Sequence, residues 1–565
     1  MTFYFKFFFF LILSLTVRAV PPNIIFMLVD DQGFNDISLH GSQQIPTPNI
    51  DAIAAAGVSF DRYYTNPVCS PTRASLMTGR ATIHHGIYLP MSAGINGGHL
   101  NLSFTLLPAY LKRAANYTTA AVGKWHLGST TVSASPVGRG FDSYTGYWCG
   151  ALNYTSHEVA GPNGTILYDF HNTTATTDEP LVGAYGTFST NVFVDTATAI
   201  IAKQGAAQKL SPDSPPLFLY LAWQNVHWPL DAPQEYVARF ANTTGGDHNR
   251  NYVAAMNAFL DDAVGNVTGA ISAAGMVDNT IIILVSDNGG PRFPTGTEPG
   301  AASNFPLRGG KDTLWEGGVR VNGMMRGPGI AAGVTSSAYV HVTDWLPSLV
   351  SMATGGEDYR NFSSPGEPPF QAGDGLDVWT SIASGGVTPS PRNWLLLEAH
   401  PDLSSVHGNG LIIDDLKLLT YGSEENGNVE DGWFVPPGQN ASTIDYSVKC
   451  TSAGFPRTGA ANASQCKAPS WCLFNITSDP CEYYDLSLSQ PIDLANMIAA
   501  IAKYQATAVP PNYGSACMPS LTCEDAPLAP RGQLTAVWPC DGMRGNITKP
   551  CPKYEGQATF LVLDE

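Results

Sequence analysis

The clearest pattern in the chain is a series of short apolar runs that stop abruptly at polar residues. The first run covers residues 23–29 and ends at Asp30 and Asp31. Because apolar and polar positions do not alternate within it, we expect a parallel strand covered on both faces. Similar runs predict further strands at residues 58–64, 118–122, 217–223 and 280–285.

Between these runs the apolar residues take up the spacing of an amphipathic helix. In residues 47–57, Pro48 lies near the start, apolar side chains recur at helical intervals and Gly57 ends the segment. The same pattern predicts helices at residues 106–115, 191–203 and 251–274. Strands that alternate with helices predict an α/β domain with a large, mostly parallel sheet.

The amino-acid composition of the chain changes after about residue 355. Gly, Pro and Ser are dense through residue 391, and within this stretch residues 374–383 have a helical pattern. We therefore expect a main domain at residues 20–391 and a smaller α+β domain, built on an antiparallel sheet, at residues 392–565. Short hairpin strands are predicted at residues 394–398, 411–414, 416–421 and 471–476, and a helix at residues 492–504.

Residues 1–19 have the features of a signal peptide. Lys6 precedes an apolar core at residues 7–17, and small residues flank a cleavage site near Ala19. The core is too short to cross a bilayer comfortably, so we expect no stable membrane insertion, with an uncleaved anchor as the alternative. The chain is thus expected in the secretory pathway, lysosomal or extracellular. N-glycosylation sequons agree with this and lie at Asn101, Asn116, Asn153, Asn163, Asn172, Asn242, Asn266, Asn361, Asn440, Asn462, Asn475 and Asn546.

The cysteines are segregated along the chain. Eight of the ten lie between Cys450 and Cys551, which in an oxidising compartment predicts a disulfide framework rather than a zinc site. The close pair Cys472 and Cys481 is predicted to close a hairpin. Cys149 either reaches the C-terminal domain or remains a free thiol.

Charge excludes one class of partner. The formal net charge is −18, whereas a nucleic-acid-binding protein would show a basic face. A small anionic substrate is still compatible, because salt screens the distant acidic surface beyond about 8–10 Å. We therefore expect no nucleic-acid partner.

Four of the predicted strands end in polar clusters. In open α/β sheets, ligands bind outside the carboxyl ends of the strands, so the four clusters are expected at one rim. This argument for a functional site depends on the strand pattern alone. The clusters are Asp30 with Asp31, Lys124 with His126, His227, and Asp287 with Asn288.

The oxygen-bearing clusters suit a metal ion. Asp30, Asp31, Asp287 and Asn288 offer three carboxylates and an amide oxygen, and calcium takes 6–8 hard oxygen ligands. Magnesium is the alternative, although it prefers to keep its waters. Each Asp alone would more often be a helix cap or turn residue, and it is the two pairs after two buried strands that favour metal.

The basic side chains suit an anion. Arg73, Lys124 and Lys311, with His126 and His227, could surround a doubly charged tetrahedral group. Fixed positive charge in a dry site stabilises charge that develops during group transfer. Taken singly, each lysine would more often be a solvated loop residue and His227 a packed loop histidine.

The sequence CSPTR at residues 69–73, followed by TGR at residues 78–80, resembles the signature of the sulfatase family. Alone, it would more often mark a buried or disulfide-bonded cysteine beside a turn. Other segments are similar to sulfatase motifs in sulfatase order, and the last two resemble the arylsulfatase B branch in particular. They are DDQG at 30–33, GKWHLG at 123–128, SDNGG at 286–290, LRGGK at 307–311, WEGGVR at 315–320 and TDWLP at 343–347.

This resemblance implies an alkaline-phosphatase-like fold and one calcium ion held by Asp30, Asp31, Asp287, Asn288 and residue 69. It also implies that a formylglycine-generating enzyme converts Cys69 to formylglycine (3-oxoalanine). One hydroxyl of the hydrated aldehyde, polarised by calcium and Arg73, would attack sulfur. His227 and Lys311 would bind the sulfate, and one of them would protonate the leaving alcohol. Lys124 would bridge the sulfate and residue 69. His126 would take a proton from the second hydroxyl of the hydrate, which would expel sulfate.

The resemblance implies hydrolysis of sulfate esters, from sulfated carbohydrates or aryl sulfates, and favours 4-sulfated N-acetylgalactosamine. The alternatives are a phosphoric ester hydrolase of the same superfamily and a catalytically silent glycan-binding glycoprotein. Residues 90–106 lack the cysteines expected in the arylsulfatase B branch, so its disulfides are not transferable. Trp228 and Trp315 are candidates to stack on sugar rings, with a packing role as the alternative for each.

Overall fold

The computed structural model describes residues 21–91, 98–128, 131–160, 166–292, 299–400, 408–420, 432–450, 463–512 and 535–536. The predicted signal peptide, several of the sequons and the four cysteines after Cys481 lie outside these residues. In the part of the chain that the structure describes, no helix combines the length and the apolar character needed to cross a membrane.

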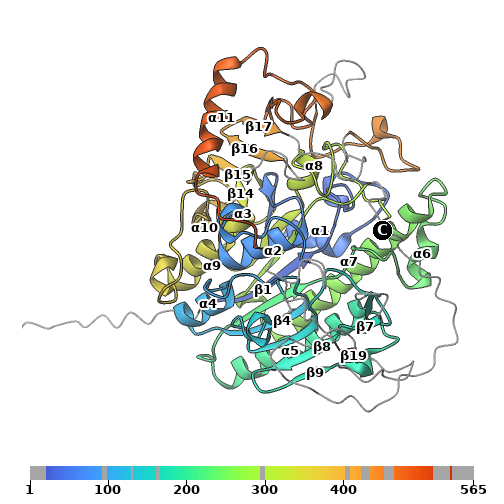
Figure 1. Ribbon diagram of the computed structural model, residues 1–565. Coiled ribbons are helices and arrows are strands. Elements are labelled where there is room, and N and C mark those ends of the chain that lie inside the picture. The colour runs from blue at the N-terminus through green and yellow to red at the C-terminus, as the bar shows by residue number, and fades with distance from the viewer. Residues whose placement is uncertain are drawn as a thin grey trace, which may run out of the picture.

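A mixed ten-stranded sheet is the centre of the described structure (Figure 1). Its order is β13-β2-β12-β11-β1-β10-β4-β5-β8-β9, and the five strands from β11 to β5 run parallel. The predicted large, mostly parallel sheet is therefore confirmed. The strands are β1 (Asn23–Val29), β2 (Val58–Phe60), β4 (Thr118–Lys124), β5 (Ser143–Tyr147), β8 (His171–Thr174), β9 (Asp178–Pro180), β10 (Leu217–Ala222), β11 (Thr280–Ser286), β12 (Gly323–Arg326) and β13 (Val334–Ser336).

Strand β1 shows why the first apolar run does not alternate. Ile24, Phe26 and Leu28 belong to one hydrophobic core, and Ile25 and Met27 belong to another on the opposite face. A strand that is buried on both faces needs apolar residues at every position.

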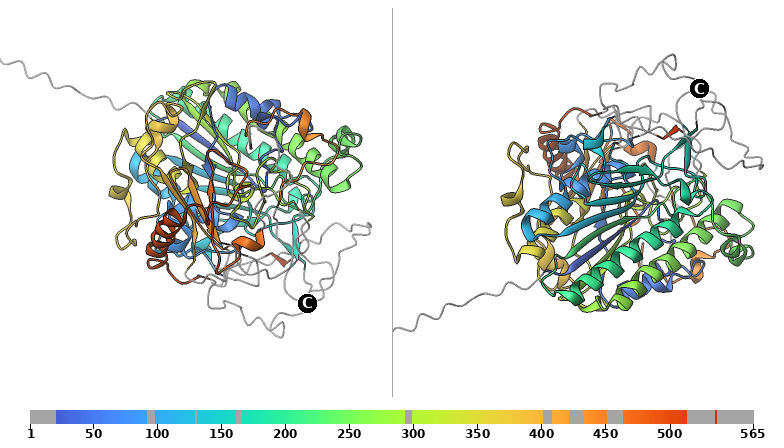
Figure 2. Two further views of the ribbon diagram at one scale, coloured as in Figure 1. Left: turned by 90° about the horizontal axis from the view of Figure 1, so that it is seen from above. Right: turned by 90° about the horizontal axis from the view of Figure 1, so that it is seen from below.

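Helices cover both faces of this sheet (Figure 2). On one face, α1, α5 and α7 contribute to the core that contains Ile25, and on the other α2, α4 and α9 contribute to the core that contains Ile24. The helices are α1 (Pro48–Ala55), α2 (Cys69–Thr78), α3 (Thr82–His85), α4 (Leu107–Ala115), α5 (Ser189–Leu210), α6 (Gln234–Phe240), α7 (His248–Ala274), α8 (Glu316–Val319), α9 (Trp345–Thr354), α10 (Trp379–Ala383) and α11 (Pro491–Gln505).

The chain after residue 393 forms a four-stranded antiparallel sheet of order β15-β16-β17-β18, as predicted. We call it the C-terminal sheet; helix α11 packs beside it, at the top of Figure 1. Its strands are β15 (Trp394–Ala399), β16 (Asn409–Ile413), β17 (Leu416–Thr420) and β18 (Cys472–Asn475).

Small sheets and single-turn helices complete the described elements. The short strands are β3 (Tyr63–Tyr64) with β14 (Val340–His341), and β6 (Glu158–Ala160) with β7 (Ile166–Tyr168) and β19 (Thr535–Ala536). The 3-10 turns are η1 (Ser38–His40), η2 (Val132–Ala134), η4 (Val182–Ala184), η5 (Val277–Asn279), η6 (Val342–Asp344), η7 (Tyr359–Phe362), η8 (Ala441–Thr443) and η9 (Ala463–Cys466).

Three predicted elements differ from the structure. The run at residues 58–64 forms two short strands, β2 and β3, because the chain turns at residues 61–62 and β3 pairs with β14 instead. The helix predicted at 374–383 is limited to α10. Strand β4 continues two residues beyond the predicted end, so Lys124 is its last residue.

The predicted pairing of Cys472 with Cys481 is wrong. Cys472 is bonded to Cys466, and Cys481 is bonded to Cys450. Sequence spacing suggested a hairpin, but the chain after β18 turns away toward the segment that contains Cys450. Among the described residues, Cys69 and Cys149 are buried free thiols.

Candidate active site

The site is built where the four central parallel strands β11, β1, β10 and β4 end. These strands are neighbours in that order, so their carboxyl ends meet at one edge of the sheet. Backbone hydrogen bonds continue beyond the strands: Asp30 N–H donates to Asn225 O (2.9 Å) and Asp287 N–H to Val29 O (3.0 Å). The polar clusters predicted from the sequence are therefore brought together by the strand order.

Helix α2 carries the signature to this edge. Cys69 is its first residue, and every residue of the helix is buried. The helix ends at Gly79, whose φ of +67° is the left-handed conformation that favours glycine at this position. The conformation of this segment places Cys69 at the site and leaves Arg73 one turn deeper.

Three acidic groups and an amide lie together in the buried site. Asp31 N–H donates to Asp287 Oδ1 (3.2 Å), and Asn288 Nδ2 donates to Asp31 Oδ1 (2.7 Å). Asp30, Asp31, Asp287 and Asn288 are all fully buried. Burial and the neighbouring Asp30 carboxylate raise the pKa of Asp287 to about 7.

This oxygen cluster fits a hard cation. Asp30 Oδ1 and Asn288 Oδ1 are buried and have no hydrogen-bond partner among the described residues. Buried polar atoms are normally paired, so two such oxygens beside carboxylates are suited to bind a cation. One ligand atom from each of Asp30, Asp31 and His227 lies within 4.8 Å of the others, so His227 lies close enough to share a cation with these two carboxylates.

The basic side chains pair with these same acids. Lys124 Nζ lies 2.7 Å from Asp30 Oδ2, and Arg73 Nη2 lies 2.7 Å from Asp287 Oδ2. Arg73 also donates to the carbonyl oxygen of Lys124 (3.1 Å). The acids thereby hold Arg73 and Lys124 in fixed orientations, which is what a preorganised anion site needs.

Lys311 and His227 approach from a second side. Lys311 Nζ lies 2.8 Å from Asp31 Oδ2 and 3.4 Å from His227 Nε2. Burial disfavours the charged Asp31 carboxylate, but Lys311, His227 and Lys124 outweigh burial and hold its pKa below the ordinary value. All the predicted cationic residues except His126 are thus connected to the oxygen cluster by direct contacts.

His126 is held close to α2. Its carbonyl oxygen accepts a hydrogen bond from Ser70 Oγ (2.9 Å), and a Cβ at Gly150 would come within 2.7 Å of its Nε2. Its Nδ1 is buried without a hydrogen-bond partner among the described residues. Burial and the charges of Lys124 and Arg73 lower its pKa well below the ordinary value, which favours the neutral ring.

The Cys69 side chain is not a thiolate. Burial raises its pKa to about 11, although Lys124 and Lys311 act in the opposite direction. Since thiolates and not thiols are the nucleophilic form, an unmodified Cys69 is poorly suited to attack an ester at neutral pH.

Two groups were missed or left open by the sequence. Ser70, which lies inside the signature, had no predicted role; its hydroxyl accepts from Met91 N–H and donates to His126, tying two loops to α2. Trp315 is 1% exposed and packs against Phe474, so the packing alternative holds for it.

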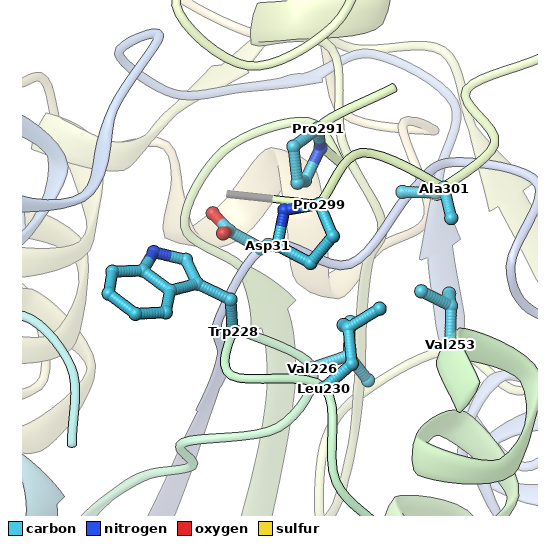
Figure 3. A pocket seen from close by; sticks show the side chains of 9 residues that line it. Asp31, Val226, Trp228, Leu230, Val253, Pro291, Pro299 and Ala301 are labelled. Carbon is cyan, nitrogen blue, oxygen red and sulfur yellow. The ribbon is translucent and has the colours of Figure 1, made fainter. Parts of the chain in front are cut away.

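Trp228, unlike Trp315, is partly exposed and lies at the edge of the site. It is half-buried and lines a small hollow beside Asp31, shown in Figure 3. In that view the Trp228 indole and the Asp31 carboxylate lie on one side, and Val253 and Ala301 lie on the other. The hollow borders the oxygen cluster, and apart from Asp31 its lining is apolar.

A site of this composition, at the carboxyl edge of a parallel sheet, is suited to a hydrolase that acts on anionic esters. The comparison with known families gives the particular family: residues 22–355 match the sulfatase family model. The chain belongs to the sulfatase family.

Individual relatives agree with this assignment. The chain is 34% identical to mouse (Mus musculus) arylsulfatase J over 515 residues, covering 88% of this chain and 78% of the relative. It is 32% identical to mouse N-acetylgalactosamine-6-sulfatase over 385 residues, covering 66% of this chain and 68% of the relative. These relatives establish the family and leave the arylsulfatase B branch a prediction.

Solved structures share the fold. The crystal structure of Ps i-CgsB in complex with k-i-k-neocarrahexaose superposes with a TM-score of 0.66 at 26% identity, covering 89% of this chain and 96% of that chain. Ps i-CgsB in a second crystal structure gives a TM-score of 0.65 at 27% identity, covering 87% of this chain and 94% of that chain. The predicted alkaline-phosphatase-like fold with a smaller antiparallel sheet is confirmed.

Proposed function

We propose that this protein hydrolyses sulfate esters of carbohydrates, or aryl sulfates, at the site around residue 69. The observation that carries the proposal is the place of Cys69. It is the first residue of a buried helix, and the charges of Lys124, Lys311, Asp30 and Asp287 all act on its side chain. A tetrahedral dianion next to residue 69 would meet cations on two sides.

The proposed cofactor is one calcium ion, held by Asp30, Asp31, Asp287, Asn288 and residue 69. When bound, it would supply positive charge that polarises the nucleophile and neutralises charge on the sulfate. The two orphaned oxygens and the mutual repulsion of the carboxylates support this assignment. Oxygen ligands in this number suit calcium better than magnesium.

The proposed nucleophile is a formylglycine made from Cys69 by a formylglycine-generating enzyme. As a hydrate, this group supplies one hydroxyl for attack on sulfur and a second whose deprotonation releases sulfate. A buried thiol with a raised pKa would leave the site without a strong nucleophile, which is why the modification is needed.

The other side chains would hold the anion and move protons. Arg73 and Lys124, fixed by Asp287 and Asp30, would orient residue 69 and bind sulfate oxygens. Lys311 and His227 would bind sulfate from the other side, and one of them would protonate the leaving alcohol. The neutral His126 would accept the proton from the second hydroxyl.

For the substrate we propose a sulfated sugar, such as N-acetylgalactosamine 4-sulfate. Relatives named N-acetylgalactosamine-6-sulfatase and the solved complex with k-i-k-neocarrahexaose support the sugar class. For the location we propose a lysosomal or extracellular site, which fits the predicted signal peptide and the disulfides.

The test combines peptide mass with turnover. Protein from a eukaryotic secretory host should carry an aldehyde at residue 69 and release sulfate from 4-nitrophenyl sulfate and from at least one sugar in a panel of 4- and 6-sulfated N-acetylgalactosamine. Cys69→Ala and Cys69→Ser should each lose more than about 10³-fold in kcat. The matched control is Cys149→Ser, which removes the other buried free thiol of the described residues and should keep turnover.

Three results would contradict the proposal. Unmodified cysteine throughout a fully active preparation would remove the nucleophile. Release of phosphate from 4-nitrophenyl phosphate, with no release of sulfate from any member of the panel, would identify a phosphoric ester hydrolase instead. Sugar binding without any turnover would indicate a silent glycan-binding protein.

A further inference from the structure

Arg308 and the segment of residues 315–320, which both belong to motifs noted in the sequence, have no role in the site described above. Arg308 lies three residues before Lys311, and the segment of residues 315–320 begins four residues after Lys311. The segment between them carries Lys311 and connects to the C-terminal sheet. Its contacts suggest what the two motifs do.

The guanidinium of Arg308 is almost completely buried (1% exposed) and faces the C-terminal part of the chain. Its central carbon lies 3.6 Å from the ring centre of Trp315 and 4.7 Å from that of Trp433. Its Nη1 donates to the carbonyl oxygen of Glu482 (3.0 Å). A cation between two indoles with a carbonyl acceptor is held in one orientation.

The backbone around Arg308 is tied down as well. The carbonyl oxygen of Arg308 accepts from Gly317 N–H (2.6 Å), and Gly309 N–H donates to Gly432 O (3.0 Å). Gly309 has a φ of +74°, and a Cβ there would come within 2.7 Å of Trp315 Cβ. The short path from Arg308 to Lys311 is therefore held by backbone hydrogen bonds and by the close contact of Gly309 with Trp315.

The Glu482 side chain extends this connection to the C-terminal sheet. Its Oε2 accepts from Glu316 N–H (2.8 Å), and its carboxylate pairs with Lys417 of β17 (2.8 Å). Lys417 also pairs with Glu316 (2.9 Å), which accepts from Tyr64 OH (2.8 Å). These side chains are fully buried, so the charges are shielded from water and from salt.

Lys311 lies at the other end of the restricted segment. Its N–H donates to Gly290 O (3.3 Å), and its Nζ reaches Asp31 (2.8 Å) and His227 (3.4 Å). A displacement of about 1 Å at such a group can cost on the order of 100-fold in rate. The contacts that fix Arg308 therefore influence the position of the Lys311 ammonium group.

We propose that Arg308 is a positioning residue for Lys311, and that Trp433 and Glu482, from the C-terminal part of the chain, act on the active site through it. The proposal rests on the proposed role of Lys311 in binding the sulfate. In it the C-terminal part of the chain helps to hold the active site in its working geometry, through its contacts with Arg308.

The test is a double-mutant cycle with Arg308→Lys and Lys311→Ala, measured as kcat and KM for 4-nitrophenyl sulfate and as inhibition by inorganic sulfate. Lysine keeps the charge and loses the planar fork. Lys311→Ala alone should lower kcat/KM on the order of 10²–10³-fold. Arg308→Lys alone should lower it on the order of 10-fold and weaken inhibition by sulfate. In the Lys311→Ala background, Arg308→Lys should have no further effect, because the group that it positions is gone.

A matched control comes from another arginine that contacts the C-terminal part of the chain. Arg62 lies 4.9 Å from the ring of Tyr339 and donates to Thr477 Oγ1 (2.7 Å), but it does not contact the Lys311 segment. Arg62→Lys should leave kcat, KM and inhibition by sulfate unchanged. If Arg308→Lys does not fold, as judged by thermal unfolding, Trp433→Leu replaces it in the same cycle.

The outcomes separate the two proposals. If Lys311→Ala keeps wild-type activity, the proposed role of Lys311 fails. If Lys311→Ala is impaired and the loss caused by Arg308→Lys is equally large in both backgrounds, Arg308 acts on something other than Lys311 and the positioning proposal is overturned. An equal loss from Arg62→Lys would show a general effect of contacts with the C-terminal part of the chain and would also overturn it.

Discussion

Several histidines of this protein are buried without a charged role, and His341 is the clearest example. Its Nδ1 lies 2.9 Å from Thr343 Oγ1 and caps the turn η6. Burial and the nearby Arg392 lower its pKa to about 3. The neutral ring is therefore the form that the folded protein accommodates.

This gives a prediction for stability against pH. The folded-state pKa of His341 lies below the value of about 6.5 in unfolded chains, so its contribution is complete above pH 6.5 and is lost as the pH falls from there toward 3. Lowering the pH from 7 to 4.5 should reduce the free energy of unfolding of the wild type by on the order of 2 kcal/mol more than that of His341→Asn.

Chemical denaturation at a series of pH values measures this difference. The control is His248→Asn, which replaces an exposed histidine at the start of α7. Identical slopes for His341→Asn and the wild type would contradict the prediction. Asparagine retains a capping oxygen, so loss of the cap does not confuse the comparison.

At the scale of elements, the site depends on how closely β4 and β10 approach. Gly123 has a φ of +101°, and a Cβ there would come within 1.8 Å of Ala222 O. Across the other edge of β4, a Cβ at Gly146 would come within 2.0 Å of Gly123 O. Glycine at these positions lets the strands pair up to Lys124, which then emerges at the rim.

Gly123→Ala should therefore destabilise the protein by about 2–4 kcal/mol, by forcing β4 away from β10. Guanidinium unfolding measures the cost. Gly246→Ala is the control, because Gly246 also has a positive φ (+82°) but has no atom within 4 Å of the added Cβ; it should cost about 1 kcal/mol. Equal costs for the two variants would show that the strand contact is unimportant.

Much of this element order follows from the sequence, because it depends on local patterns. The apolar runs 23–29, 217–223 and 280–285 correspond to β1, β10 and β11 within a residue. The strands that were not predicted, such as β5, β8 and β12, are short and contain Gly, Thr or Asn; they are strands because neighbouring strands supply hydrogen bonds. The bend at residues 61–62 likewise depends on the distant partner β14.

At the scale of the molecule, the proposed calcium ion should link binding to folding. A ligand that binds only the folded state adds about 2.7 kcal/mol at 100 times its Kd. We expect a calcium chelator to lower the Tm and added calcium to restore it, with a smaller effect of magnesium. Asp287→Asn should remove most of the calcium-dependent rise, and an unchanged Tm with chelator would contradict the proposed metal site.

The disulfides give a second prediction at this scale. Cys450–Cys481 closes a separation of 31 residues, and Cys466–Cys472 one of 6. Chain entropy predicts about 3–4 kcal/mol for the longer loop and about 2 kcal/mol for the shorter. Replacing both cysteines of a pair by serine and measuring Tm should therefore show the larger fall for the first pair; the reverse order would contradict the entropic account.

We propose that the boundary between the main domain and the smaller C-terminal domain lies at about residue 391, as predicted from the sequence. The two cores beside the C-terminal sheet also contain residues from before residue 391, such as Trp315 and Ile83. Lys417 of the sheet and the nearby Glu482 both contact Glu316, which follows Lys311 in the chain. Under the positioning proposal, the two parts are thus one functional unit.

The sequence by itself determined the buried strands and the chemistry at their ends, because apolar runs and strand-end residues are local properties of the chain. Its resemblance to the sulfatase signature identified the candidate nucleophile. Only the tertiary structure decided which atoms meet. Residues that lie far apart in sequence meet in three such places. These are the buried oxygens of Asp30 and Asn288, which have no hydrogen-bond partner among the described residues, the two disulfides and the contacts of Arg308. Such contacts are fixed by the packing of whole elements, which no local pattern encodes.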